Sequence, residues 1–206
     1  MALTTIDAMC ALVVIDLQKG IVSARTEAPV TAAVERSARL ASEFRRHGLP
    51  VVLVNVTGRA PGRTDTVRSR DGARAGGEAR AGGGARAGGG AGRPSDWAEL
   101  VAELGVRPGD HLITKRRRSA FHDTGLDTLL RDLGVTQVVL TGISTSSGVE
   151  STARSASDHG YHVVLATDAM ADPDAEAHRH SVERVFPKLG ETATTAEVVT
   201  MLEATR

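Results

Sequence analysis

The 206-residue chain contains one cysteine, few aromatic residues and no net charge, and each of these scarcities excludes a class of protein. Because Cys10 has no second cysteine to pair with, an internal disulfide is excluded, and no Cys/His spacing of the zinc-binding type is present. Basic and acidic residues number 25 each, so no overall basic field favours nucleic acid, and aromatic residues at 2% disfavour the stacking of single-stranded bases. We therefore expect neither a metal site nor a nucleic-acid partner.

Long apolar runs are also missing. No stretch approaches the roughly 20 apolar residues of a membrane span, and the N-terminal segment lacks the basic residues and apolar core of a signal peptide. We expect a cytoplasmic protein that does not contact a membrane. The length corresponds to a single domain over residues 1–206, whose core depends on Val, Leu, Ile and Ala.

Short apolar runs alternate with longer amphipathic segments, which indicates βαβ units and a parallel sheet. This pattern predicts a Rossmann-like, three-layer α/β/α sandwich around a mostly parallel sheet of six strands. The expected strands are residues 11–15, 51–56, 110–114, 135–141 and 161–167, with a short edge strand near Ala193. The expected helices are residues 29–47, 126–133, 149–159, 174–187 and 195–204.

A Gly/Ala/Arg-rich segment at about residues 71–93 separates the second and third expected strands. It contains near-identical hexads that begin at Ala73, Ala79 and Ala85. Glycine this dense loses much backbone entropy on ordering, and the segment has almost no apolar side chains to offset that loss. We interpret it as an expanded surface loop, because the cost of closing a loop grows only logarithmically with its length. The alternative is a basic arm or lid over a binding site.

The most informative stretch is residues 141–154, Thr-Gly-Ile-Ser-Thr-Ser-Ser-Gly-Val-Glu-Ser-Thr-Ala-Arg, which joins an expected buried strand to an expected helix. A tight strand-to-helix elbow presents one residue at a helix N-terminus, where free backbone N–H groups and the helix dipole favour a developing negative charge. The residue at that position is Gly148, which has no side chain to attack a substrate.

Asp16, Lys115 and the elbow each follow a different expected strand. In an open parallel sheet, ligands bind beyond the carboxyl ends of the strands, so these groups are expected to converge although they are far apart in the sequence. An Asp alone in this position is more often a helix cap, and a Lys alone is usually solvated. The prediction of a site therefore depends on the combination.

These segments together resemble the isochorismatase-like cysteine hydrolases. In that family a segment of the form T-G-x-x-T-x-x-C-V-x-x-T-A carries the nucleophile, and residues 141–153 match every fixed position except the cysteine. Residues 12–18, Leu-Val-Val-Ile-Asp-Leu-Gln, are similar to the family's opening strand with its catalytic Asp, and residues 115–121 are similar to its K-x-x-x-S-A-F segment. Residues 168–172 and His178 fit a later and less specific family pattern.

The resemblance implies a hydrolase that acts on a small molecule, needs no cofactor and forms a homo-oligomer. Isochorismatases themselves carry glycine where the cysteine enzymes carry the thiol, so Gly148 is compatible with hydrolysis of a vinyl ether, which needs no acyl-enzyme. The resemblance then makes Asp16 the general acid, with Lys115 and Gly148 as the other catalytic positions. It also implies a cis peptide bond at Ile143–Ser144, which turns an N–H group toward an oxyanion.

An ordinary Asp is protonated only about once in a thousand at neutral pH, so a catalytic acid requires burial and an anionic substrate to raise its pKa. Anion-binding groups are therefore expected. The candidate substrate-binding residues are Gln18, Arg59, Arg63, Arg117, Ser144, Thr145 and Ser147. Of the three consecutive arginines at residues 116–118, only Arg117 fits the isochorismatase form of the motif, and the alternative for this run is a solvated basic face.

The chain also departs from typical isochorismatases. Lys-Gly-Ile-Val follows Gln18 where aromatic residues are usual, and Arg118 replaces a tyrosine, so the pocket is not built for isochorismate in the usual way. No Asp-x-His metal motif follows the second strand, which argues against a nicotinamidase.

Two alternatives to acid–base hydrolysis stay open. A nucleophile displaced to Ser144, Ser146 or Ser147 would preserve covalent hydrolysis of an amide or other C–N bond, although the sequence places no base beside it. A binding protein that kept the pocket and lost turnover is the second alternative. Cys10 is expected to be a buried thiol at the opposite end of its strand.

Overall fold

The computed structural model describes residues 3–25, 27–58 and 94–205 and contains a central sheet of six strands in the order β3-β2-β1-β4-β5-β6. Every pairing between neighbouring strands is parallel. The strands are β1 (Cys10–Ile15), β2 (Val51–Val56), β3 (His111–Lys115), β4 (Gln137–Ile143), β5 (His162–Ala171) and β6 (Glu191–Ala193). The predicted α/β class and strand number are confirmed, and the sheet is wholly rather than mostly parallel among these residues. Arg59, Arg63 and the repeated hexads lie outside the described residues.

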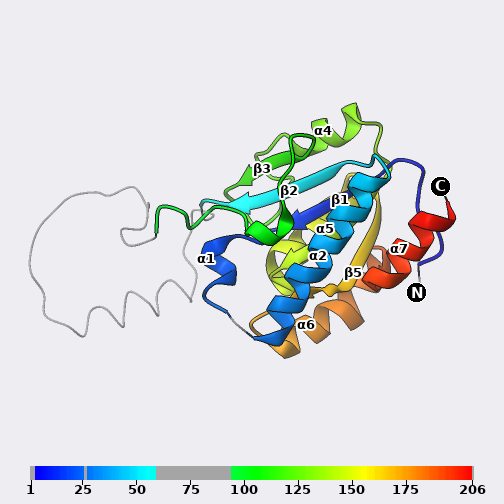
Figure 1. The fold of residues 1–206 in the computed structure, drawn as a ribbon. Helices are drawn as coiled ribbons and strands as arrows, with labels where there is room; N and C mark the ends of the chain where they lie inside the picture. Colours follow the sequence, from blue (N-terminus) through cyan, green and yellow to red (C-terminus); the bar gives the residue numbers. More distant parts are fainter. Residues whose placement is uncertain (1–2, 26, 59–93, 206) are drawn as a thin grey trace, which may run out of the picture.

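The helices alternate with the strands along the chain (Figure 1). They are α1 (Lys19–Val22), α2 (Ala28–Arg46), α4 (Leu126–Asp132), α5 (Glu150–Asp158), α6 (Ala175–His180) and α7 (Thr195–Ala204). The 3-10 and π-helical turns of the described residues are η1 (Ala102–Leu104), η2 (Thr145–Val149), η3 (Ser181–Val185) and η4 (Phe186–Lys188). The ends of α2 show how sequence sets these limits, since Pro29 occupies its first turn and Gly48, at φ 68°, follows its last.

The two faces of the sheet are covered by different helices, which gives the predicted three layers. Along β1 the side chains alternate, as they must in a strand: Leu12 and Val14 pack in the cluster with α2 and α7, whereas Ala11 and Val13 pack in the cluster with α4 and α5. Figure 1 shows α2 and α7 side by side on one of these faces. Cys10 is fully buried at the start of β1, at the end of this strand away from Asp16, as predicted.

Two elements differ from the sequence-based expectation. The fifth strand continues to Ala171 rather than ending at residue 167, because the register shifts between Leu140 and Gly142 of β4 and a bulge takes up the polar Asp168. There Asp168 accepts hydrogen bonds from the backbone and hydroxyl of Thr195. The helix expected over residues 174–187 is divided into α6, η3 and η4, with a proline in the last turn, and α1 and η1 had no prediction.

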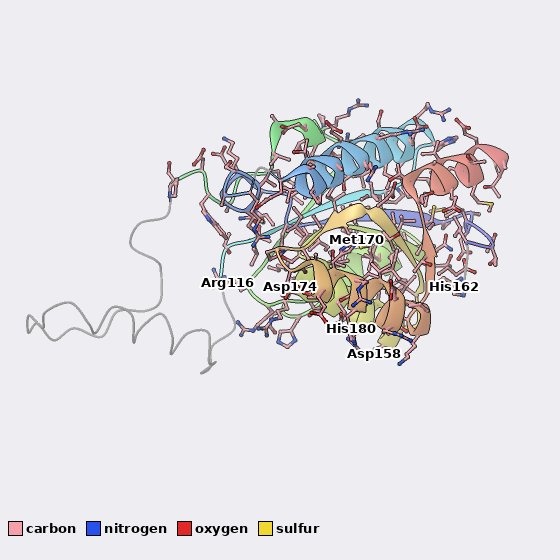
Figure 2. The ribbon with its side chains drawn as sticks, turned by 90° about the horizontal axis from the view of Figure 1, so that it is seen from below. Arg116, Asp158, His162, Met170, Asp174 and His180 are labelled. Carbon is pink, nitrogen blue, oxygen red and sulfur yellow. The ribbon has the colours of Figure 1, made fainter. Side chains whose placement is uncertain are left out.

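The order of the strands predicts where a ligand site lies at their carboxyl ends. Strand β1 pairs with β2 on one side and with β4 on the other, so the connections that follow β1 and β4 diverge to opposite faces, and a ligand site is expected between them. Figure 2 shows Arg116, which follows β3, and Asp174, which follows β5, far from His162 at the amino end of β5.

Candidate active site

Asp16 is the first residue after β1 and has a left-handed backbone, at φ 55°. This conformation is uncommon outside glycine, although Asp tolerates it better than most residues. Two backbone hydrogen bonds fix the turn: the N–H group of Asp16 donates to Val54, and its carbonyl accepts from Gln18. The carboxyl group is thereby held at the carboxyl end of the sheet.

Lys115 is the last residue of β3 and extends to Asp16 from two strands away. Its Nζ lies 2.8 Å from Asp16 Oδ2, and the two side chains are only 2% and 8% exposed. Nζ also donates a 2.8 Å hydrogen bond to the carbonyl of Arg118. A buried ammonium is tolerated only with such partners, so the two residues form one unit, as their positions at strand ends predict.

Only one of the two oxygens of the Asp16 carboxyl group takes part in this ion pair. Its Oδ1 is buried and has no hydrogen-bond partner among the described residues. Burial raises the pKa of Asp16 to about 6, although the neighbouring Lys115 lowers it. A pKa of about 6 leaves about one molecule in ten protonated at pH 7, so protonation costs about 1.4 kcal/mol instead of about 4 kcal/mol. Asp16 is therefore suited to deliver a proton near neutral pH.

Gly148 faces this ion pair from the π-helical turn η2. A Cβ atom at this position would lie 3.2 Å from Asp16 Oδ2, 3.3 Å from Lys115 Nζ and 3.1 Å from Ile15 Cγ2. The backbone of Gly148 lies outside the left-handed region, as predicted. The position of the family's nucleophile is thus beside the Asp–Lys pair, and the side chain alone is missing.

The close approach of β4 to β1 depends on a second glycine. Gly142 has φ 118°, and a Cβ atom there would clash with the backbone of Ile15. Glycine is required because no other residue fits both the angle and the space. This contact brings the elbow that follows β4 beside Asp16, which follows β1.

The elbow is fastened by the chain that follows β5. The expected cis peptide bond at Ile143–Ser144 is present. Asp172 Oδ2 accepts hydrogen bonds from both the backbone N–H and the hydroxyl of Ser146, at 2.8 and 2.7 Å. Thr145 Oγ1 and His178 Nδ1 share a hydrogen bond of 2.8 Å. Contacts from Asp172, which follows β5, and from α6 therefore fix successive residues of the elbow.

The structure distributes the predicted substrate-binding residues unevenly. Ser144, Thr145 and Ser147 lie in or next to η2, beside Gly148, but Thr145 is buried and engaged with His178. Arg117 lies in the segment after β3 and faces Asp123, with Arg117 Nη2 and Asp123 Oδ2 separated by 3.4 Å.

Gln18 has a structural role in place of the predicted substrate contact. It is completely buried, its Oε1 accepts from the N–H of Val56, and its Nε2 donates to the carbonyls of Val56 and Trp97. The carboxamide is thus occupied by backbone groups. The strand-end motif predicted that Gln18 would lie near the site but carried no sign of these partners, which come from segments 38 and 79 residues away.

One residue that sequence reasoning missed lies beside the elbow. Arg25, in the connection between α1 and α2, places Nη1 3.5 Å from Ser144 Oγ. No motif marks Arg25, and its contact joins residues 119 positions apart, so only the tertiary structure reveals it.

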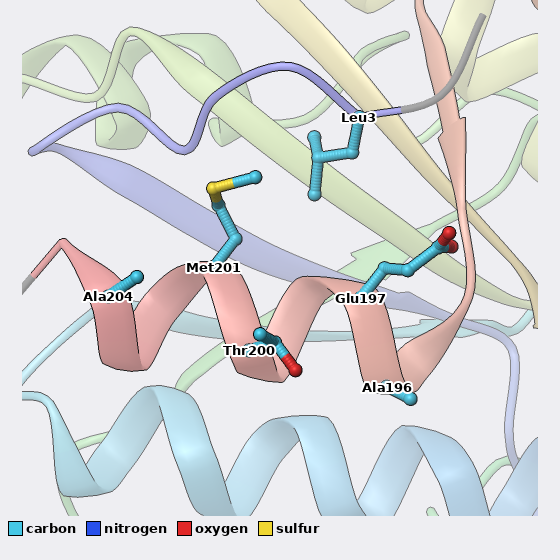
Figure 3. A pocket seen from close by; sticks show the side chains of 6 residues that line it. All are labelled: Leu3, Ala196, Glu197, Thr200, Met201 and Ala204. Carbon is cyan, nitrogen blue, oxygen red and sulfur yellow. The ribbon is translucent and has the colours of Figure 1, made fainter.

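One hollow of the described chain lies away from the Asp16–Lys115 ion pair. It lies between the N-terminal segment and α7, is shown in Figure 3, and is lined by Leu3, Ala196, Glu197, Thr200, Met201 and Ala204. Its one carboxylate, on Glu197, caps the start of α7 through Thr194.

The described residues contain no group of three or more potential metal ligands. Within the same ranges, no helix has the length and apolar character needed to cross a bilayer.

The chain is similar to known proteins in sequence and in structure. Residues 10–197 match the family model described as the isochorismatase domain. The chain is 40% identical over 187 residues to the uncharacterized isochorismatase family protein YwoC of Bacillus subtilis, which covers 91% of this chain and 90% of YwoC. It is 29% identical over 195 residues to maleamate amidohydrolase of Pseudomonas putida, covering 93% and 86% of the two chains. The structure of an isochorismatase family protein from Burkholderia thailandensis superposes with a TM-score of 0.77 at 36% identity, covering 97% of this chain and 98% of the other.

Proposed function

Because this chain belongs to the isochorismatase family of hydrolases, we propose that it hydrolyses a small, anionic substrate by acid–base catalysis at Asp16 and Lys115, without a covalent intermediate. The observation that carries the proposal is the state of Asp16. Its Oδ1 is buried and unpaired within the described chain, its pKa is raised to about 6, and it lies beside the position where a nucleophile is missing. In this state Asp16 can carry a proton near neutral pH and donate it, and residue 148 has no thiol to act as a nucleophile.

The reaction that needs only these groups is hydrolysis of a vinyl ether, as in isochorismate. Asp16 donates its proton to the terminal vinyl carbon, which forms a C–H bond and leaves an oxocarbenium ion that the new carboxylate stabilises. Water adds to the cationic carbon and gives up a proton, which restores the acid. The resulting hemiketal then breaks its C–O bond and releases an alcohol and a keto acid, which is pyruvate when the substrate is isochorismate.

Lys115 orients the acid in this scheme. Its ammonium group is held between Asp16 Oδ2 and the carbonyl of Arg118, so it fixes the carboxyl group beside the elbow. After proton transfer Lys115 balances the charge of the carboxylate. Its presence lowers the pKa of Asp16, but burial outweighs this effect and keeps the acid usable near neutral pH.

Hydrolysis of a C–N bond is the second candidate, because the chain is similar to maleamate amidohydrolase over most of its length. A displaced serine nucleophile would need a base beside it. The hydroxyl of Ser146 donates to the Asp172 carboxylate, which also caps its backbone N–H. The histidine at the elbow, His178, is paired with the buried Thr145 instead. The group that accepts the Ser146 hydroxyl hydrogen is thus a carboxylate, which is a weaker base than an imidazole, and this favours the acid–base scheme over a serine nucleophile.

The deciding experiment measures products from purified protein supplied with isochorismate, maleamate, simple amides or N-carbamoyl compounds. Release of pyruvate from isochorismate supports the vinyl-ether reaction. Ammonia from the nitrogen compounds, without pyruvate, supports C–N hydrolysis. Binding of these compounds without either product contradicts both and identifies a non-catalytic binding protein.

A further inference from the structure

Arg25 occupies the same edge of the sheet as the Asp16–Lys115 pair. The chain leaves β1 at its carboxyl end, forms α1, and passes through Arg25 before α2 returns along the sheet. Arg25 is half-buried, and its Nη1 lies 3.5 Å from Ser144 Oγ, four residues before Gly148. The guanidinium group is therefore next to the elbow rather than in the solvent beyond it.

The charge of Arg25 has no counterion in the described part of the chain. Other arginines that are at least partly buried do have one: Arg45 makes a forked pair with Asp110, with bonds of 2.9 and 2.7 Å, and Arg117 faces Asp123. Among the residues that the structure describes, Arg25 has only its long contact with the Ser144 hydroxyl, and 3.5 Å is near the limit for a hydrogen bond. A partly desolvated guanidinium without an anion gains little to offset its lost hydration.

The contact with Ser144 also leaves a second donor available. Ser144 Oγ accepts from Arg25, so its own hydrogen is left to donate. A guanidinium fork beside a hydroxyl donor matches a carboxylate, which accepts through two oxygens. Neutral ligands would leave the charge of Arg25 unpaired.

We propose that Arg25, with the Ser144 hydroxyl, binds the carboxylate of the substrate and so restricts this site to small carboxylic acids. The inference rests on the proposed function, in that both place the substrate at the carboxyl edge of the sheet, beside the elbow and Asp16. It also supplies the anion-binding group that acid catalysis requires, because a bound carboxylate near Asp16 disfavours ionisation of the acid. Arg25 is thereby an anion-binding candidate in addition to Arg59, Arg63 and Arg117, which the sequence predicts.

The test compares binding of maleate, a dicarboxylate, with binding of maleamide, the neutral diamide of the same skeleton, by isothermal titration calorimetry. Arg25→Ala should weaken maleate about tenfold or more, because a charged bidentate contact is lost, and should change maleamide by less than about twofold. Arg25→Lys keeps the charge without the fork and should bind maleate with intermediate affinity. Arg39→Ala is the matched control, since it removes one exposed positive charge from α2 and should leave maleate affinity within about twofold.

Several results would overturn the assignment. These are maleate affinity in Arg25→Ala within about twofold of the wild type, an equal loss in Arg39→Ala, or no binding of maleate by the wild type at millimolar concentration. Thermal melting of each variant checks folding, and the Lys variant keeps the test valid if the Ala variant is unstable.

Failure of this inference is distinguishable from failure of the proposed function. Maleate binding that depends on Arg25, in a protein that turns over none of the tested compounds, upholds the anion site and refutes the catalytic proposal. Turnover that depends on Asp16 but keeps its kcat/KM in Arg25→Ala upholds catalysis and refutes the anion site.

Discussion

At the scale of residues, the proposed function depends on a single carboxyl group, that of Asp16. The sequence identifies Asp16 from its place after an apolar strand and from the family motif, but it does not give the protonation state. That state depends on burial by neighbours from other strands and on the 2.8 Å contact with Lys115. Two effects of opposite sign compete, and only the folded geometry shows that burial is the larger.

The raised pKa of Asp16 predicts a pH profile. If Asp16 acts as the acid, kcat/KM depends on its protonated form, which dominates below a pKa of about 6 and declines about tenfold for each pH unit above it. We expect kcat/KM, measured from pH 5 to 8.5 on the substrate that the product screen identifies, to fall as pH rises through about 6. An increase through the same range would indicate a carboxylate base instead.

Replacement of the acid gives the complementary result. Asp16→Asn should abolish turnover while the fold and ligand binding persist. Residual activity within about tenfold of the wild type would correspond to less than about 1.4 kcal/mol of barrier, which is too little for a catalytic acid.

Gly148→Cys tests the environment of the missing nucleophile. The new Cβ would lie 3.2 Å from Asp16 Oδ2 and 3.3 Å from Lys115 Nζ, and the backbone angle of Gly148 suits any residue. Lys115 and the helix that follows should lower the thiol pKa below about 8.5. We expect iodoacetamide to label the introduced thiol much faster than the fully buried Cys10, as measured by peptide mass spectrometry.

The control for this variant is Gly148→Ala, which adds the Cβ without the thiol. Contacts of 3.1 to 3.3 Å are tight, so comparison of its melting temperature with the wild type shows whether the site adjusts to the added atom. A folded Gly148→Cys protein that is labelled no faster than a denatured control would show that the elbow no longer activates a thiol.

Gln18 and Arg25 show that a sequence motif predicts which residues lie near the site better than it predicts what each residue contacts. Gln18 belongs to the family-like segment and was predicted to contact substrate, yet its carboxamide is wholly used by backbone groups. Arg25 belongs to no motif, yet it lies beside the elbow. Both outcomes depend on contacts between segments remote in sequence, which spacing along one chain does not encode.

At the scale of elements, the elbow is a short turn held in place by the segment that follows β5. The sequence indicates the strand, the turn and the following helix, because apolar periodicity and glycine are local signals. It does not indicate that η2 is π-helical or that Asp172 and His178 fasten it, since those contacts come from residues after β5. The position of Gly148 thus depends on the elbow itself and on the residues that follow β5, and the sequence motif of the elbow does not include the second of these.

Asp172→Ala tests this fastening. Loss of both hydrogen bonds to Ser146 should lower the free energy of unfolding by about 1–3 kcal/mol and should reduce kcat, because the elbow is no longer fixed beside Asp16. Urea denaturation and kcat measure the two effects.

Thr194→Ala is the matched control, because Thr194 caps α7 through the N–H group of Glu197, and α7 packs against α2 and β5. Its loss should cost about 1 kcal/mol of stability and leave kcat unchanged. An equal loss of kcat in the two variants would mean that general destabilisation, not the position of the elbow, controls activity.

At the scale of the whole molecule, the alternation of strands and helices predicts a parallel sheet, because parallel strands need crossover connections. No local sequence pattern predicts the strand order β3-β2-β1-β4-β5-β6, but this order sets where the candidate site lies. It sets β1 between β2 and β4, so Asp16 and the elbow become neighbours and Lys115 extends to them from β3. The homo-oligomer implied by the resemblance stays a prediction.

Gln18 also has a consequence for the whole chain, because it joins the segments on either side of the Gly/Ala/Arg-rich insert. Its carboxamide bonds to Val56, at the end of β2, and to Trp97, beyond the insert. Lys19 adds ion pairs with Asp96 and Glu99, at 3.3 and 2.6 Å. Both ends of the insert are therefore anchored to the segment that follows β1, independently of what lies between them.

Deletion of residues 71–93 should consequently leave the fold and its activity intact. The anchors formed by Gln18 and Lys19 remain, and the shorter connection changes the closure entropy by less than about 1 kcal/mol, since each doubling of loop length costs only about 0.6 kcal/mol. We expect a melting temperature within a few degrees of the full chain and an unchanged kcat/KM. Gln18→Leu is the contrasting variant, because it removes the three hydrogen bonds that this fully buried carboxamide makes to the backbone of Val56 and Trp97, and it should destabilise the protein clearly. A deletion variant that melts like the full chain but loses more than about tenfold in kcat/KM would reject the interpretation of the insert as a passive surface loop. It would instead support a basic lid that acts on the substrate at the carboxyl edge of the sheet.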